Sequence, residues 1–140
     1  MRMAEALVLD SEALNAIANP STRSVLAQRA RAILSIAYDR RALVRVPAPV
    51  LGEVCSGPRF DAAINRVLNG RGILVEPLTQ QIAERAGALL SEARMSSRNA
   101  VDAFVVATAL EFDSAFIATG DPDDIKRLVA RHTKVRVFPI

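Results

Sequence analysis

Short apolar runs alternate with longer segments of helical periodicity along the whole chain. The apolar runs predict strands at residues 6–10, 43–46, 73–75, 115–118 and 135–138. Apolar residues at helical intervals predict helices at residues 11–18, 22–41, 59–68, 79–94, 99–111 and 121–131, and a short helix that begins near Pro49. Because strands and helices alternate, the pattern predicts an α/β fold, with a mainly parallel central sheet flanked by helices.

The three longest predicted helices differ in how their apolar residues are distributed. Residues 99–111 (NAVDAFVVATALE) are apolar on nearly every face, which predicts the central helix packed against the sheet. In residues 79–94 the predicted inward face consists of Ile82, Ala86, Leu89 and Leu90. In residues 22–41 the apolar positions that recur at helical spacing are Val25, Leu26, Ile33, Leu34 and Ala37.

Length and composition favour one domain over residues 1–140. The chain is 51% hydrophobic, which is enough for one substantial core, and it has no apolar run as long as a membrane span. Its first residues lack the apolar stretch of a signal peptide, so we expect a cytoplasmic protein with no membrane partner. The single cysteine, Cys55, is expected to be a small buried residue without a functional role.

The net charge of +3 comes almost wholly from arginine, since only Lys126 and Lys134 are lysines. Arginine favours a nucleic-acid partner because its guanidinium binds phosphate in a fork, but the arginines are scattered, and biased codon usage explains the composition equally well. With no Trp, one Tyr and five Phe, a platform that stacks single-stranded bases is not indicated.

Four acidic residues lie where a buried segment meets a turn or a helix start: Asp10, Glu53, Asp102 and Asp121. Asp10 ends the first predicted strand and Asp121 follows the fourth, so both belong to the carboxyl edge of the sheet, where ligands bind in open parallel sheets. Glu53 and Asp102 lie on helices that start near the same edge. A carboxylate beside a core is costly unless something positive satisfies it, so the set indicates a metal site.

Each acid also has a purely structural interpretation. Asp10, Asp102 and Asp121 are placed as helix caps or first-turn acids, and Glu53 alone is typical of a solvated helix residue. Asp102 fits this interpretation least, because apolar residues surround it in the sequence. Among the acids nearby, Asp124 is a candidate extra ligand, whereas solvated positions are expected for Glu12 and Asp123.

Other catalytic arrangements find little support. The only histidine, His132, lies late in the chain, so neither a Ser-His-Asp triad nor a zinc site is indicated, and no phosphate-cradling glycine loop is present. Ligands that are all oxygen atoms fit Mg²⁺, with Mn²⁺ as the alternative.

With the motifs VLDSEAL, PAPVLGEV, AVDAFVVATA and TGDPDD in this order, the chain resembles the PIN-domain ribonucleases, and within them the VapC-like toxins of toxin–antitoxin pairs. The resemblance covers nearly the whole chain. It implies a metal-dependent endoribonuclease that hydrolyses RNA phosphodiester bonds, a homodimer and a small cognate antitoxin. Glu12 departs from the family, in which many members have a small residue.

The resemblance carries the family's catalytic acids over to Asp10, Glu53, Asp102 and Asp121. We expect Asp10 and Asp102 to be the main metal ligands, Glu53 to be a ligand or to orient water, and Asp121 to bind a second metal or act through water. Ser11 is expected to hydrogen-bond a carboxylate or a phosphate.

Two alternatives remain open from the sequence. A haloacid-dehalogenase-like phosphatase of small phosphomonoesters also begins with a strand that ends in aspartate, but its general acid is an aspartate two residues later, where this chain has Glu12. The other alternative is a non-catalytic nucleic-acid-binding module of the same fold, in which the acids are only caps.

Overall fold

The fold is built on a parallel β-sheet. The computed structural model describes residues 2–19, 24–70 and 72–140. Its sheet has five strands in the order β3-β2-β1-β4-β5, and every neighbouring pair is parallel. The strands are β1 (Arg2–Leu9), β2 (Leu43–Pro47), β3 (Ile73–Glu76), β4 (Phe112–Thr119) and β5 (Val135–Pro139). The predicted α/β class is therefore confirmed.

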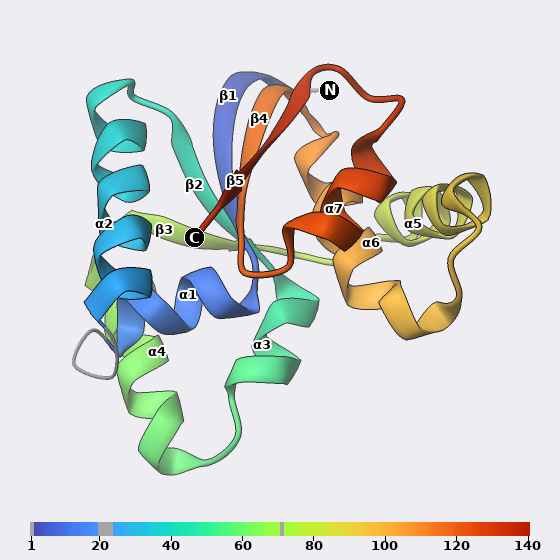
Figure 1. Ribbon diagram of the computed structural model, residues 1–140. Coiled ribbons are helices and arrows are strands. Elements are labelled where there is room, and N and C mark those ends of the chain that lie inside the picture. Colours follow the sequence, from blue (N-terminus) through green and yellow to red (C-terminus); the bar gives the residue numbers. More distant parts are fainter. Residues whose placement is uncertain (1, 20–23, 71) are drawn as a thin grey trace.

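Helices cover the sheet on both faces, as Figure 1 shows. One group of helices covers the half of the sheet that contains β2 and β3. The other group surrounds α6, which lies against β1 and β4. The first group is α1 (Ser11–Ala18), α2 (Ser24–Asp39) and α4 (Pro58–Gly70). The second is α5 (Gln80–Ala93), α6 (Ala100–Ala109) and α7 (Pro122–Val129). The short α3 (Ala48–Val54) follows β2, and a 3-10 turn, η2 (Ser97–Asn99), precedes α6.

The centre of the core is formed by β1 and α6. The last residues of β1 are buried because the strand has neighbours on both sides and helices on both faces. As predicted, α6 is buried almost all round, at Ala103 and from Val105 to Ala109. The predicted inward face of α5 is also correct, with Ile82, Ala86 and Leu89 buried and Leu90 partly buried.

The buried face of α2 differs from the prediction. It consists of Ala27, Ala30, Leu34 and Ala37, with Ile33 partly buried. Val25 is 56% exposed and Leu26 is 37% exposed, so these two members of the recurring apolar set lie outside the core. The small alanines are the side chains that face the rest of the protein. Residues 22 and 23, the predicted start of this helix, lie outside the described residues.

Two strands, β1 and β4, begin earlier than their apolar runs. Arg2 pairs with Phe112, so β1 and β4 extend together beyond the segments that hydrophobicity marks. This pairing joins residues far apart in the sequence. Hydrophobicity does not reveal it, because several residues at the start of these strands are polar or exposed.

Cys55 is exposed, which contradicts its predicted burial. It caps the carboxyl end of α3, where the chain leaves the helix and turns away from the core. In the part of the chain that the structure describes, no helix has the length and apolar character needed to cross a bilayer.

A candidate metal centre at the carboxyl edge of the sheet

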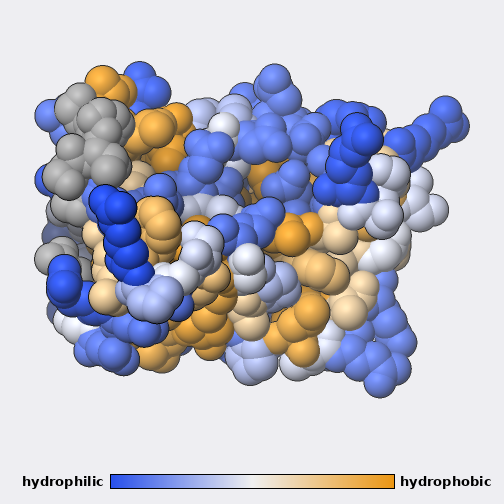
Figure 2. Space-filling view, turned by 90° about the horizontal axis from the view of Figure 1, so that it is seen from below, coloured by the Kyte–Doolittle hydropathy of each residue, from blue (hydrophilic) through white to orange (hydrophobic). Residues whose placement is uncertain are grey.

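A cavity of about 310 Å³ opens at the carboxyl ends of β1 and β4. Figure 2 views the molecule from below Figure 1, toward this end, and shows hydrophobic patches among hydrophilic residues. The cavity is lined by Asp10, Ser11, Glu12, Glu53, Val101, Asp102, Val105 and Asp121. The structure thus brings together all four acids selected from the sequence.

Asp10 is both the cap of α1 and a wall of this cavity. Its Oδ1 accepts a hydrogen bond from the Ala13 N–H at 2.9 Å, and its Oδ2 accepts one from the Gly120 N–H at 3.2 Å. Only 6% of the residue is exposed, and this burial raises the pKa of the carboxyl group. The capping interpretation is therefore geometrically correct. It does not exclude a ligand role, because each carboxylate oxygen has a second lone pair.

Three carboxylates converge beside Asp10. One oxygen atom of each of Asp102, Asp121 and Asp124 lies within 4.8 Å of the other two. Asp102 comes from the first turn of α6, while Asp121 precedes α7 and Asp124 lies in its first turn. Asp124 is the member of this group that the sequence marked only as an extra candidate.

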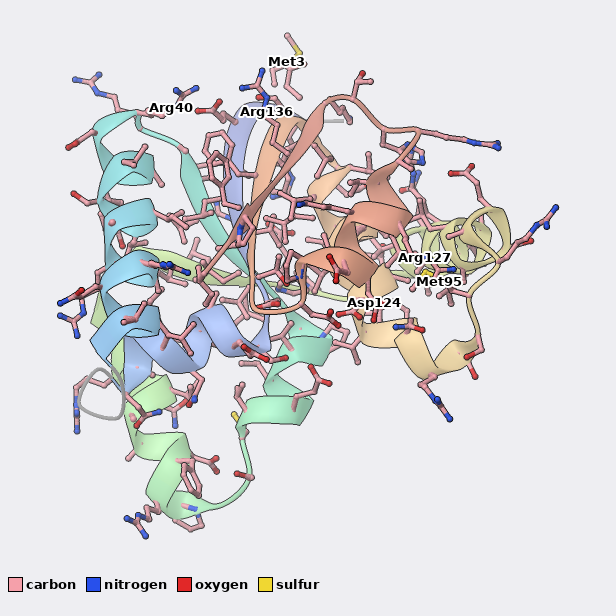
Figure 3. The ribbon with its side chains drawn as sticks, in the orientation of Figure 1. Met3, Arg40, Met95, Asp124, Arg127 and Arg136 are labelled. Carbon is pink, nitrogen blue, oxygen red and sulfur yellow. The ribbon has the colours of Figure 1, made fainter. Side chains whose placement is uncertain are left out.

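Asn99 connects these acids, and it was not selected from the sequence. Its Nδ2 donates to Asp124 Oδ2 at 3.0 Å and lies 3.5 Å from Asp102 Oδ2. In Figure 3 Asp124 lies on the lower side of α7, facing the start of α6. The signal that could have found Asn99 is its position three residues before Asp102, because residues at this spacing share one face of a helix.

The electrostatics of the group are those of crowded carboxylates. Burial raises the pKa of Asp102 to about 6, and repulsion from Asp121, Asp124 and Asp10 adds to the effect, although the Asn99 amide opposes it. The pKa of Asp121 is raised by burial and by Asp124. Among the described residues, no ion pair includes any of these acids. Oxygen donors without a counter-ion fit a hard divalent cation such as Mg²⁺ or Mn²⁺.

Glu53 and Ser11 form the opposite wall of the cavity. Glu53 is exposed on α3, and the Ser11 hydroxyl at the start of α1 donates a hydrogen bond to Glu53 Oε1. This bond fixes the position of Glu53 relative to Asp10, the residue before Ser11.

Glu12 is exposed, as expected, but it also lines the cavity. Its side chain packs over Gly120, where an added Cβ would lie 1.8 Å from Glu12 Oε2 and 2.9 Å from Glu12 Cβ. A larger residue at position 120 would therefore displace the Glu12 side chain. The expectation that Glu12 is merely solvated is incomplete. Asp123 is exposed, as predicted.

Comparison with known families gives a match that covers most of the chain. The PIN domain matches residues 7–130. The chain belongs to the PIN-domain family. This PIN domain has the same fold as a solved structure described as "Toxin-antitoxin complex from Klebsiella pneumoniae", with a TM-score of 0.64 and 20% identity over 96% of this chain and 99% of that chain. A search of curated proteins finds no match.

The carboxylates of this PIN domain are delivered by separate elements to one edge of the sheet. Asp10 follows β1, Glu53 lies on α3, Asp102 begins α6, and Asp121 and Asp124 come after β4. The only histidine, His132, contacts Glu92 at 3.2 Å and does not line the cavity. Acid–base chemistry in the cavity therefore depends on carboxylates.

Proposed function

We propose that this PIN domain is a metal-dependent endoribonuclease that hydrolyses RNA phosphodiester bonds, acting in the cytoplasm as the toxin of a type II toxin–antitoxin pair. The observation that carries the proposal is the convergence of Asp102, Asp121 and Asp124 beside the buried Asp10, with no ion-pair partner for them among residues 2–19, 24–70 and 72–140. Unpaired carboxylates repel each other, and a divalent cation relieves this cost.

The residues of the site divide into those that would hold the cation and those that would place the substrate. Asp102, Asp121 and Asp124 offer oxygens close enough to share an ion, and Asp10 faces the same cavity. Glu53, held by Ser11, is positioned to accept a proton from a water molecule or to bind an ion itself. Bound Mg²⁺ or Mn²⁺ would supply positive charge where negative charge develops on the phosphate during hydrolysis.

An antitoxin is the proposed protein partner. The solved structure of the same fold is described as a toxin–antitoxin complex, which supports this part of the proposal. A second cavity, also of about 310 Å³, adjoins the acidic one and shares Ser11, Glu12 and Glu53 with it. Phe60, 45% exposed on α4, lines that cavity, while α2 exposes Val25 and Leu26. An inhibitor with apolar side chains and an arginine would fit, because arginine pairs bidentately with carboxylates.

Membership of the PIN family favours a nuclease over the phosphatase alternative. The residue two positions after Asp10 also counts against the phosphatase, because that class has an aspartate as general acid there and this chain has Glu12. The non-catalytic alternative makes a different prediction, since acids that only cap helices would not bind a cation saturably. A homodimer is proposed from the family resemblance.

The deciding experiment combines catalysis with metal binding. Purified protein, freed of any partner, is incubated with RNA and Mn²⁺ or Mg²⁺, with chelator in a parallel sample. We expect cleavage that the chelator stops, and we expect Asp102→Asn to fold normally but lose both cleavage and saturable Mn²⁺ binding. Asp113→Asn, an exposed acid on β4, is the matched control. Cleavage that survives in Asp102→Asn would contradict the proposed site.

The toxin role is tested separately in cells. We expect growth arrest when the protein is expressed alone, and rescue with copurification when the neighbouring small reading frame is expressed with it. A protein that is harmless alone and does not bind its neighbour would refute the toxin role while leaving the nuclease role intact.

A further inference from the structure

A groove lies on the face of the sheet that α2 leaves uncovered, at the end opposite the acidic cavity. It has a volume of about 310 Å³ and lies between α2, the first half of β4 and the exposed face of β5. In Figure 3 Arg40 and Arg136, which line it, lie at the top of the molecule, whereas Asp124 lies well below them. None of the groove's lining residues belongs to the proposed metal centre.

The walls of this groove are apolar and aromatic. Ile33 and Ile36 on α2 face Phe116 and Phe138 on the sheet. The two phenylalanine rings meet edge to face, with centroids 5.3 Å apart and an interplanar angle of 88°. Phe138 is 41% exposed, so this side chain remains partly available to a planar group.

The polar residues of the groove have an excess of positive charge. Arg40, Lys134 and Arg136 line it together with one carboxylate, that of Glu5. Arg40 is already occupied, because its Nε and Nη2 donate to the two Glu5 oxygens at 2.9 and 2.8 Å. Three cations and one carboxylate leave two positive charges for a ligand to meet.

The other two cations differ in their contacts, although Arg136 also interacts electrostatically with Glu5. Lys134 Nζ donates to the carbonyl oxygens of Leu110 and Phe112, both at 2.8 Å, which fixes the ammonium group without neutralising it. Arg136 forms no ion pair or side-chain hydrogen bond within the described part of the chain. Strand register places Arg136 beside Phe116, so a cation and an aromatic ring are neighbours on the floor of the groove.

We propose that this groove binds a small anion with a planar aromatic body, the anionic group meeting Arg136 and Lys134 and the aromatic body lying against Phe138 and Ile36. The volume and the mainly apolar walls with a few charged groups are those of a small-molecule site. The excess positive charge selects an anion over a neutral aromatic compound. Aromatic carboxylates and nucleoside monophosphates share this chemistry. The inference does not depend on the proposed nuclease function, because the groove and the acidic cavity have no residue in common.

The test compares four probes on the full chain by calorimetry: 1-naphthoate, its neutral analogue 1-naphthalenemethanol, inorganic phosphate and adenosine monophosphate. We expect at least one of the two aromatic anions to bind about tenfold more tightly than both the neutral analogue and phosphate. Which of the two binds better identifies the natural class as a carboxylate or a nucleotide. Equal binding of 1-naphthoate and its neutral analogue, together with no preference for the nucleotide over phosphate, would overturn the proposal.

Substitutions in the groove test whether the aromatic anion binds there. Arg136→Gln and Phe138→Ala are each expected to weaken the tighter aromatic anion about tenfold, whereas Arg85→Gln, the same change on the exposed face of α5, should leave its affinity unchanged. Full affinity in Arg136→Gln would overturn the proposal. Sedimentation of the same variants tests whether a second copy of this chain occupies the groove instead. A change of oligomeric state in Phe138→Ala would assign the groove to a second copy of this chain and overturn the small-ligand proposal.

Discussion

The side-chain amide of Asn99 binds the carboxylate of Asp124 at 3.0 Å, and this contact joins the start of α6 to the first turn of α7. The same nitrogen lies 3.5 Å from Asp102 Oδ2. A single neutral donor therefore holds two repelling carboxylates in one place. Because Asn99 has a side-chain oxygen as well, its amide orientation follows from the two acids that it faces.

Removal of this amide should weaken metal binding without removing a ligand. We expect Asn99→Ala to lower Mn²⁺ affinity by about tenfold or more, because groups that orient metal ligands typically contribute this much. Isothermal calorimetry measures the affinity. Asn69→Ala, at an exposed position near the end of α4, is the matched control. Unchanged affinity in Asn99→Ala would show that the amide does not position Asp124.

The raised pKa of Asp102 predicts how the free energy of unfolding of the metal-free protein depends on pH. Since the folded-state pKa is raised from 3.8 to about 6, the group's stabilising contribution is present at low pH and is lost as the pH rises through about 6. Asp102→Asn cannot ionise, so it avoids this loss. At neutral pH we expect the free energy of unfolding of the variant to exceed that of the parent by about 1–2 kcal/mol. This value follows from the pKa shift and is reduced because the carboxyl group is only half-buried.

Urea unfolding in chelator at about pH 7 and about pH 4 measures this difference, with Asp113→Asn as the control for loss of an exposed acid. The stability difference between Asp102→Asn and the parent should be smaller at the lower pH. A gain of equal size at both pH values would contradict the proposed electrostatic cause.

Proton competition gives a second pH dependence. A metal needs the ionised carboxylate, so Mn²⁺ affinity should fall as the pH falls through about 6, where Asp102 takes up a proton. We expect roughly a tenfold loss of affinity between about pH 7 and about pH 5. Titrations at several pH values measure it. An affinity that stays constant over this range would exclude Asp102 as a ligand.

Glu76, which does not line the acidic cavity, is expected to contribute strongly to stability. This glutamate is 7% exposed at the end of β3, and its Oε1 and Oε2 accept from Arg45 at 3.1 Å and Arg2 at 2.7 Å. Glu76→Gln leaves the Arg45 guanidinium buried without a counter-ion, so we expect a loss of about 2–3 kcal/mol in the free energy of unfolding. Glu5→Gln, which breaks the more exposed pair with Arg40, should cost clearly less than Glu76→Gln, because solvent screens the exposed pair. Equal losses in the two variants would show that burial of the pair is not the cause.

A side chain at Gly120 would displace Glu12. An alanine Cβ at this position would meet Glu12 Oε2 at 1.8 Å and Glu12 Cβ at 2.9 Å, so the Glu12 side chain must turn away and its Cβ must shift. We expect Gly120→Ala to destabilise the protein by about 1–3 kcal/mol. The double variant Gly120→Ala with Glu12→Ala should recover part of this loss, and thermal unfolding measures both. No recovery in the double variant would mean that another contact causes the strain.

The sequence predicted those features that depend on local pattern. The order of strands and helices, the buried character of α6 and the edge on which Asp10 and Asp121 lie all follow from hydrophobic periodicity and from the rule for parallel sheets. Asp124 was marked only as an extra candidate, because its distance from Asp102 depends on how α7 packs on α6. Periodicity also does not show that Val25 and Leu26 lie outside the core, since alanines form the buried face of α2 and hydrophobicity alone does not reveal where a helix packs closely.

The all-parallel sheet separates two surfaces that can be modified independently. Every strand delivers its last residues to the edge with the acidic cavity, and every following helix returns the chain to the opposite end before the next strand begins. A spectroscopic label near the start of β4, introduced by Asp113→Cys in a Cys55→Ser background, would therefore lie away from the carboxylates. Such a label could report ligand binding in the groove that Arg136 lines, while the metal centre remains chemically unchanged.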